Sequence, residues 1–127
     1  MAVYLLINAA TQTGTAPSPT NPPQQAQQGA PGNPWAIQGP SNPNSPTQSQ
    51  CFILTASATS GNVSATATIV ASNDGQNWAA PASNTVSVSG APSGSSLIVL
   101  AVPAKHFAAY LSTLTGTGAT ATLTMSA

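Results

Sequence analysis

Residues 119–127 read ATATLTMSA, and their side chains alternate strictly between two kinds. Up to residue 126, alanine, leucine and methionine occupy the odd positions, and threonine and serine occupy the even ones. Because successive side chains of a β-strand point to opposite faces of a sheet, this period of two predicts a strand with one buried face and one hydroxyl-rich face. The segment decides the fold class, since related alternation returns along the C-terminal part of the chain.

Similar patterns mark four further strands upstream of this segment. They read CFILTASAT (51–59), VSATATIVAS (63–72), TVSVS (85–89) and FAAYLSTLTG (107–116). Stretches typical of turns separate them, namely TSGN, NDGQN, SGAPSGS and TGTG. Six or seven short strands at this spacing predict an all-β domain, an antiparallel β-sandwich of a jelly-roll-like kind.

One expected strand, within SLIVLAVP (96–103), is apolar on both faces. One face can fill the core, and the other needs cover from another part of the chain or from another subunit. The alternative is a central strand covered within the same chain. A domain of this size, rich in Ala, Ser and Thr, also buries little apolar area and commonly needs disulfides, metal or oligomerisation. Cys51 is the only cysteine and is expected to be a small buried apolar residue, so oligomerisation is the expected support.

The composition changes sharply near residue 51. Residues 11–50 are rich in Pro, Gln, Asn, Ser and Gly, and prolines oppose helix both at their own position and at the one before. The sequence therefore predicts an extended N-terminal arm over residues 1–50 and a sandwich domain over residues 51–127. Residues 2–7 are expected to be a strand or a hydrophobic anchor, because the apolar run is too short for a signal peptide.

The large apolar residues of this arm are the predicted partner-binding residues. Trp35 and Ile37 are expected to dock into a neighbouring subunit, and the alternative is that the arm folds back on its own domain. The full predicted set is Val3, Tyr4, Leu5, Leu6, Trp35 and Ile37.

The near absence of charge excludes several kinds of partner. Charged residues make up 2% of the 127-residue chain, against roughly 25% in an average soluble protein. One basic residue, Lys105, cannot supply the phosphate contacts that nucleic-acid or anionic-membrane binding needs. A neutral surface tends to associate, which favours a component of an assembly over a free monomer.

Asp74 is the only side-chain carboxylate, and catalytic carboxylates usually work in pairs or beside a histidine. A Ser-His-Asp triad would need both Asp74 and His106, yet the Gly-x-Ser-x-Gly pattern of a nucleophile elbow does not occur. Asn73-Asp74-Gly75 instead predicts a tight hairpin turn with Trp78 on the return strand. We therefore expect no enzyme, no catalytic residue, no metal ligand and no cofactor.

Two stretches resemble segments of small virion proteins of tailed bacteriophages. ASNDGQNWAAP (71–81) resembles their G-S-N-D-G-x-x-W hairpin, and AAYLSTLTGTGATATLTMSA (108–127) resembles the strand pair that ends the same modules. Those modules often have an arginine before the last strand pair, which this chain lacks. The resemblance implies a β-sandwich or jelly roll that decorates or cements a capsid as a dimer or trimer.

The expected partners are therefore the major capsid protein and neighbouring copies of this chain. The expected place is the capsid surface of a virion assembled in the host cytoplasm. The alternatives are a tail, head-fibre or baseplate module, or a carbohydrate-binding adhesin module that stacks sugars on Trp78 and Tyr110. Burial of Trp78 against the sheet would count against the adhesin.

Overall fold

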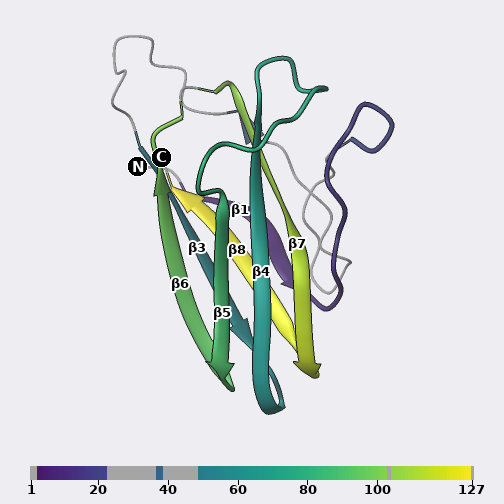
Figure 1. The fold of residues 1–127 in the computed structure, drawn as a ribbon, viewed down its shortest axis with the longest axis vertical. Coiled ribbons are helices and arrows are strands. Elements are labelled where there is room, and N and C mark those ends of the chain that lie inside the picture. Colours follow the sequence, from purple (N-terminus) through teal and green to yellow (C-terminus); the bar gives the residue numbers. More distant parts are fainter. Residues whose placement is uncertain (1–2, 23–36, 39–48, 103, 127) are drawn as a thin grey trace.

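The computed structural model describes residues 3–22, 37–38, 49–102 and 104–126, and these form two packed antiparallel sheets (Figure 1). One sheet has the order β1-β8-β3-β6 and the other β2-β7-β4-β5. The strands are β1 (Val3–Ala10), β2 (Ile37–Gln38), β3 (Gln50–Ser57), β4 (Ser60–Ser72), β5 (Thr85–Ala91), β6 (Ser93–Leu100), β7 (His106–Thr117) and β8 (Thr120–Ser126). The described residues contain no helix, so none that could cross a membrane, and the predicted all-β antiparallel sandwich is confirmed.

The alternation in the sequence sets which side chains fill the space between the sheets. In β8, Ala121, Leu123 and Met125 are buried and the hydroxyl residues between them are partly exposed. Phe52 of β3 and Phe107 of β7 come from opposite sheets and meet edge to face, with ring centroids 5.9 Å apart. Such aromatic contacts add to the apolar burial that joins the two layers.

The connection from β7 to β8 carries the glycines of the TGTG stretch. Gly116 and Gly118 have φ angles of +129° and +62°, which residues with a Cβ rarely adopt. A Cβ on Gly118 would lie 2.5 Å from Oγ1 of Thr59 in the β3–β4 turn. This motif is therefore required by the close packing of two neighbouring turns at one end of the sandwich.

The N-terminal strand corrects the predicted domain boundary. β1 pairs with β8 at the edge of its sheet and places Leu6, Ile7 and Ala10 in the core. Residues 3–10 therefore belong to the sandwich and not to an arm outside it. A composition shift near residue 51 could not reveal this, because the pairing joins the two ends of the chain.

Two pieces of the predicted arm lie on the exposed edge of β7. The Gly14 N–H donates to the carbonyl of Leu111 at 3.0 Å, and Ile37 of β2 pairs with Phe107. These described pieces follow the alternative in which the arm folds back on its own domain. The prediction for Trp35 lies outside the described residues.

Candidate functional site

The loop of residues 73–84, between β4 and β5, holds the only side-chain carboxylate. Ser72, at the end of β4, is 5% exposed. Its Oγ donates to Oδ1 of Asp74 at 2.9 Å and accepts the backbone N–H groups of Gly75 at 2.9 Å and of Asp74 at 3.3 Å. The end of β4 is therefore closed by a local ring of hydrogen bonds from one serine.

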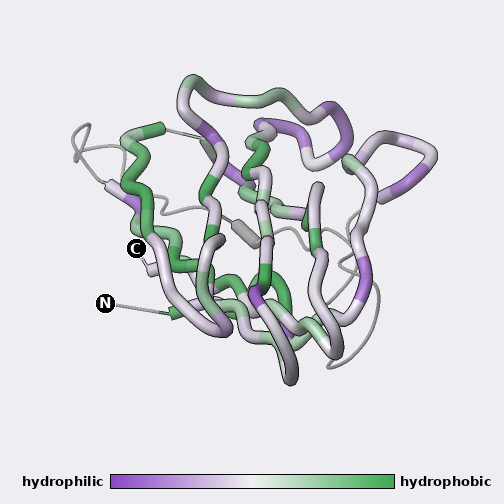
Figure 2. The backbone as a smooth tube through the Cα atoms, turned by 60° about the horizontal axis from the view of Figure 1, so that its bottom comes forward, coloured by the Kyte–Doolittle hydropathy of each residue, from purple (hydrophilic) through white to green (hydrophobic). Residues whose placement is uncertain are grey.

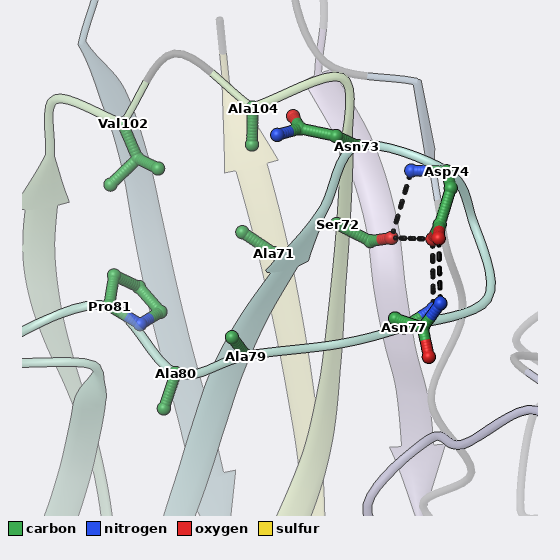
Figure 3. Close-up of a pocket in the computed structure, with 10 residues that line it drawn as sticks. All are labelled: Ala71, Ser72, Asn73, Asp74, Asn77, Ala79, Ala80, Pro81, Val102 and Ala104. Carbon is green, nitrogen blue, oxygen red and sulfur yellow. Dashed lines mark hydrogen bonds between the residues drawn. The ribbon is translucent and has the colours of Figure 1, made fainter.

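The Asp74 carboxylate uses both oxygens within the same turn (Figure 3). Oδ1 accepts the N–H groups of Gln76 at 2.9 Å and Asn77 at 2.8 Å, and Oδ2 accepts from Nδ2 of Asn77 at 2.7 Å. These bonds, led by the backbone N–H of Asn77, hold the pKa of Asp74 well below its usual value. Asp74 is an ionised turn residue, as the sequence predicts.

The predicted tight hairpin at this turn is wrong. After the Asp74 turn the chain returns along the end of β4, where Ala71 and Ala79 exchange backbone hydrogen bonds of 2.9 and 3.0 Å. β5 begins only at Thr85. Because Ser72 and Asp74 satisfy the backbone N–H groups locally, Asn73-Asp74-Gly75 opens a longer loop instead of reversing the strand directly.

Ser72, Asp74 and His106 are brought close together by the fold. Ser72 and His106 are register partners across β4 and β7, and a Cβ on Gly75 would lie 3.8 Å from Nε2 of His106. A catalytic triad needs serine bonded to histidine and histidine bonded to the carboxylate. Here the serine hydroxyl donates directly to the carboxylate, and among these three described side chains no hydrogen bond involves the imidazole. The hydrogen bonds of Ser72 and Asp74 stabilise a turn and do not follow the pattern of a triad.

A shallow hollow of about 590 Å³ lies beside this loop. Most of its walls are small or apolar side chains, and the one charged group among the lining residues is the hydrogen-bonded Asp74. The lining residues are Ala71, Ser72, Asn73, Asp74, Asn77, Ala79, Ala80, Pro81, Val102 and Ala104 (Figure 3). A carboxylate already bound on both oxygens has little capacity left for a ligand.

The aromatic pair considered for sugar stacking is only partly accessible. Trp78 and Tyr110 are both half-buried. The indole Nε1 of Trp78 is fully buried without a hydrogen-bond partner. A sugar-binding tryptophan needs an open ring face and a reachable N–H, so the partial burial of Trp78 counts against this use.

The outer face of the β1-β8-β3-β6 sheet carries the most prominent exposed feature of the described residues. Two rows cross all four strands: Val3, Ser126, Cys51 and Val99 form one, and Leu5, Thr124, Ile53 and Leu97 form the other. Val3 is 69% exposed, Leu97 and Val99 are each 57% exposed, and Ile53 is 39% exposed. We call Val3, Leu5, Cys51, Ile53, Leu97 and Val99 the outer apolar patch. The prediction that Cys51 is buried is wrong: it is only partly buried, because the alternation of β3 places it on the outer face.

The rest of the same face is covered with hydroxyl groups. Thr55 and Ser95 share a hydrogen bond of 3.0 Å between β3 and β6, and Ser57 and Thr120 share one of 3.4 Å between β3 and β8. The patch lies at the end of the sheet where both termini are found, and Figure 2 shows hydrophobic residues, in green, close to both marked ends of the chain. One end of the face therefore carries the apolar residues of β1, β3 and β6, with Ser126 and Thr124 of β8 between them, and the other end carries hydroxyl groups.

The structure separates the predicted partner-binding residues into groups. Val3 and Leu5 lie in the outer apolar patch, Tyr4 packs partly buried against the core, and Leu6 is fully buried within it. A partner cannot contact Leu6 in the folded chain.

The predicted partner-binding set did not include Ile53, and it did not place Leu97 and Val99 on the same surface as Val3 and Leu5. The two-faced apolar run from residue 97 was the signal for the latter two. β6 is an edge strand, so the alternative of a covered central strand is wrong.

Potential metal ligands do not cluster: no group of three His, Cys, Asp or Glu side chains able to hold an ion occurs in the part of the chain that the structure describes. Comparisons with family models, with curated protein sequences and with solved structures found no match for this chain.

Proposed function

We propose that this protein is a structural virion component that decorates and stabilises, or cements, a phage capsid. The observation that carries the proposal is the outer apolar patch, an uncharged and exposed surface on a sandwich whose one side-chain carboxylate is engaged in a turn. Large exposed apolar surfaces on soluble proteins mark interaction sites. A protein that acts through such a surface works by binding and not by turnover.

As part of this proposal the sandwich is a jelly roll. The strand order supports it, because β1 neighbours β8, β2 neighbours β7, β3 neighbours β6 and β4 neighbours β5. This nesting results when one long antiparallel hairpin of eight strands is rolled into two sheets. Jelly rolls of this kind occur in viral capsid proteins and in lectins.

The resemblance of residues 71–81 and 108–127 to phage virion modules favours the capsid over the lectin. Both segments have a structural explanation here: the first forms the Ser72–Asp74 turn, and the second forms the close-packed β7–β8 connection. The two segments that resemble phage virion modules are therefore segments that this fold needs for its turns. The proposal takes the resemblance one step further, from a shared fold to a shared place on the capsid.

In this function the N-terminal region has two roles. β1 completes the sandwich, and the proline- and glutamine-rich residues that follow act as a strap between neighbouring subunits. The pairing of β2 with β7 and the hydrogen bond of Gly14 would anchor this strap to its own domain. Many modest contacts spread over the shell then add up to resist internal pressure.

The experiment is a binding assay with empty shells of the phage that encodes the protein. Purified full-length protein should co-sediment with the shells up to a fixed ratio of copies per capsomer, and loaded shells should break at a higher temperature than bare ones. Failure to co-sediment with shells, combined with binding to purified tails or fibres, would instead support the tail, head-fibre or baseplate alternative.

A carbohydrate-binding adhesin is the second candidate, favoured by the occurrence of jelly rolls among lectins. It would use Trp78 and Tyr110, although both rings are half-buried. Glycan-array binding that is lost in Tyr110→Ala, in a chain that ignores shells, would support this candidate against the capsid proposal.

A further inference from the structure

We propose that the peptide bond between Asp74 and Gly75 is a site of isoaspartate formation, and that the hydrogen bonds of Ser72 keep it intact in the folded chain. The inference goes beyond the proposed function, because it concerns the covalent durability of the isolated protein. It applies whether or not the chain binds a capsid.

An aspartate followed by glycine can cyclise with its own backbone. The amide nitrogen of Gly75 attacks Cγ of Asp74, a new C–N bond closes a five-membered imide, and the carboxyl OH leaves with the amide proton as one water. Water then adds to either imide carbonyl and opens the ring, which gives back aspartate or leaves isoaspartate, with the backbone running through the side-chain carbon. The reaction needs only water, and glycine favours it because no Cβ crowds the attacking nitrogen.

The turn requires both residues of this labile pair. Gly75 has a φ of +76°, which a residue with a Cβ rarely adopts, so another residue at this position would be strained. Asp74 is needed because its carboxylate accepts the hydrogen bonds that hold the loop. The fold therefore keeps a reactive sequence for structural reasons, and its stability depends on how the two reacting groups are held.

The labile bond lies where the sheet does not restrain it. The β4 strand ends at Ser72, and Asp74 is exposed to water in the loop that follows. Restraint therefore comes from the side-chain hydrogen bonds of the turn itself (Figure 3).

The attacking group is held by Ser72. The Gly75 N–H donates to Oγ of Ser72 at 2.9 Å. Attack requires the nitrogen to turn its face toward Cγ of Asp74, and this rotation of the peptide group breaks the hydrogen bond. Breaking it adds to the barrier of ring closure.

The attacked group is held as well. Oδ1 of Asp74 accepts from Oγ of Ser72 at 2.9 Å and from the N–H groups of Gln76 and Asn77 at 2.9 and 2.8 Å. Ring closure needs a protonated carboxyl group, since an OH leaves far more easily than an oxide ion. The same hydrogen bonds hold the pKa of Asp74 well below its usual value and so keep the carboxylate ionised.

Ser72 is the residue that holds both groups, because its one hydroxyl donates to the carboxylate and accepts from the Gly75 N–H. It is 5% exposed and is the register partner of His106 on β7, so the sheet fixes its position. Ser72→Ala removes both restraints at once and leaves Asp74 and Gly75 in place.

The experiment measures isoaspartate in the full-length chain after incubation at neutral pH, for folded wild type, for wild type unfolded in urea and for folded Ser72→Ala. Asp74 is the only aspartate, so a chymotryptic peptide of unchanged mass and altered retention reports this site, whereas deamidation of an asparagine changes the mass. Folded wild type should isomerise most slowly and the unfolded chain fastest. Ser72→Ala should be about tenfold faster than folded wild type, because it loses hydrogen bonds to both reacting groups.

The matched control is Asn84→Ala, at the other end of the same loop. Nδ2 of Asn84 donates to the carbonyl of Ile69 at 2.9 Å, so this variant also loses a side-chain hydrogen bond of the loop but leaves the Asp74 turn intact. It should isomerise at the wild-type rate, and tryptophan fluorescence shows whether each variant is folded during the incubation.

Two results overturn the inference: folded wild type that isomerises as fast as the unfolded chain, and folded Ser72→Ala that isomerises no faster than Asn84→Ala. The first comparison needs no substitution, so it decides the matter even if Ser72→Ala does not fold. Failure to bind shells contradicts the proposed function and leaves this inference intact.

Discussion

Replacing Gly118 with alanine is expected to destabilise the sandwich far more than the same change at Gly61. Both glycines have left-handed backbones, with φ of +62° and +71°, which cost a residue with a Cβ about 1–2 kcal/mol. Around Gly61 there is nothing within 4 Å of an added Cβ. At Gly118 the added Cβ would lie 2.5 Å from Oγ1 and 3.0 Å from Cγ2 of Thr59.

Thr59 cannot easily move away. Its side chain is β-branched and stiff, and its Oγ1 donates a 2.9 Å hydrogen bond to the carbonyl of Thr117. Overpacking costs about 1–3 kcal/mol, and loss of the hydrogen bond costs about 1 kcal/mol. We therefore expect Gly118→Ala to lower the free energy of unfolding by about 3–6 kcal/mol and Gly61→Ala by about 1–2 kcal/mol.

The assay is urea unfolding followed by tryptophan fluorescence, with the unfolding slope checked to be the same for each variant. A second change tests the cause: Thr59→Ala removes both atoms nearest the new Cβ and should recover about 1–3 kcal/mol in the Gly118→Ala background. Equal losses at Gly118 and Gly61, or no recovery with Thr59→Ala, would refute the close-packing explanation of the TGTG stretch.

Three further outcomes follow from the same contacts. Hydrogen bonds lower the pKa of Asp74 in the folded chain, so its contribution to stability is present above the ordinary carboxyl pKa and is lost as the pH falls through the lowered pKa. The free energy of unfolding should therefore fall only below about pH 4. The fall should be smaller in Asp74→Asn, which lacks the carboxylate. Leu6→Ala should cost about 2–5 kcal/mol in urea unfolding and Val3→Ala under about 1 kcal/mol, because only Leu6 is in the core; similar costs would contradict β1 as a strand of the sandwich. His106→Ala should bind shells as the wild type does, since its ring makes no hydrogen bond to Ser72 or Asp74; loss of binding in a folded variant would contradict this.

The sequence allowed the strands to be predicted wherever the pattern was local. The period of two in residues 119–127 directly predicts β8, and the turn glycines mark where strands end. Pairings between distant segments could not be predicted in this way. β1 and β8 lie at opposite ends of the chain, and their pairing depends on the core that Leu6 and Met125 share, which no composition shift reveals.

The loop at Asp74 was mispredicted for a different physical reason. Asp-Gly favours a tight hairpin when the flanking residues continue as paired strands. Here the side chains of Ser72 and Asn77 make hydrogen bonds that replace the backbone hydrogen bonds between paired strands, and β4 ends at Ser72. The outer apolar patch was predicted only in part, because a patch is assembled by register across four strands and its members are far apart in the sequence.

The edge strands and the outer face of the β1-β8-β3-β6 sheet lack charged side chains. Soluble sandwiches usually protect edge strands and exposed faces with lysines and other charges, which discourage pairing with further chains. Only Lys105 and Asp74 are charged, and neither lies on the edge strands β1, β5 or β6. The β7 edge, in contrast, is partly covered by Gly14 and β2. One edge is thus covered by the chain's own backbone while an apolar face stays without charge, which supports the proposal that another subunit of an assembly covers that face.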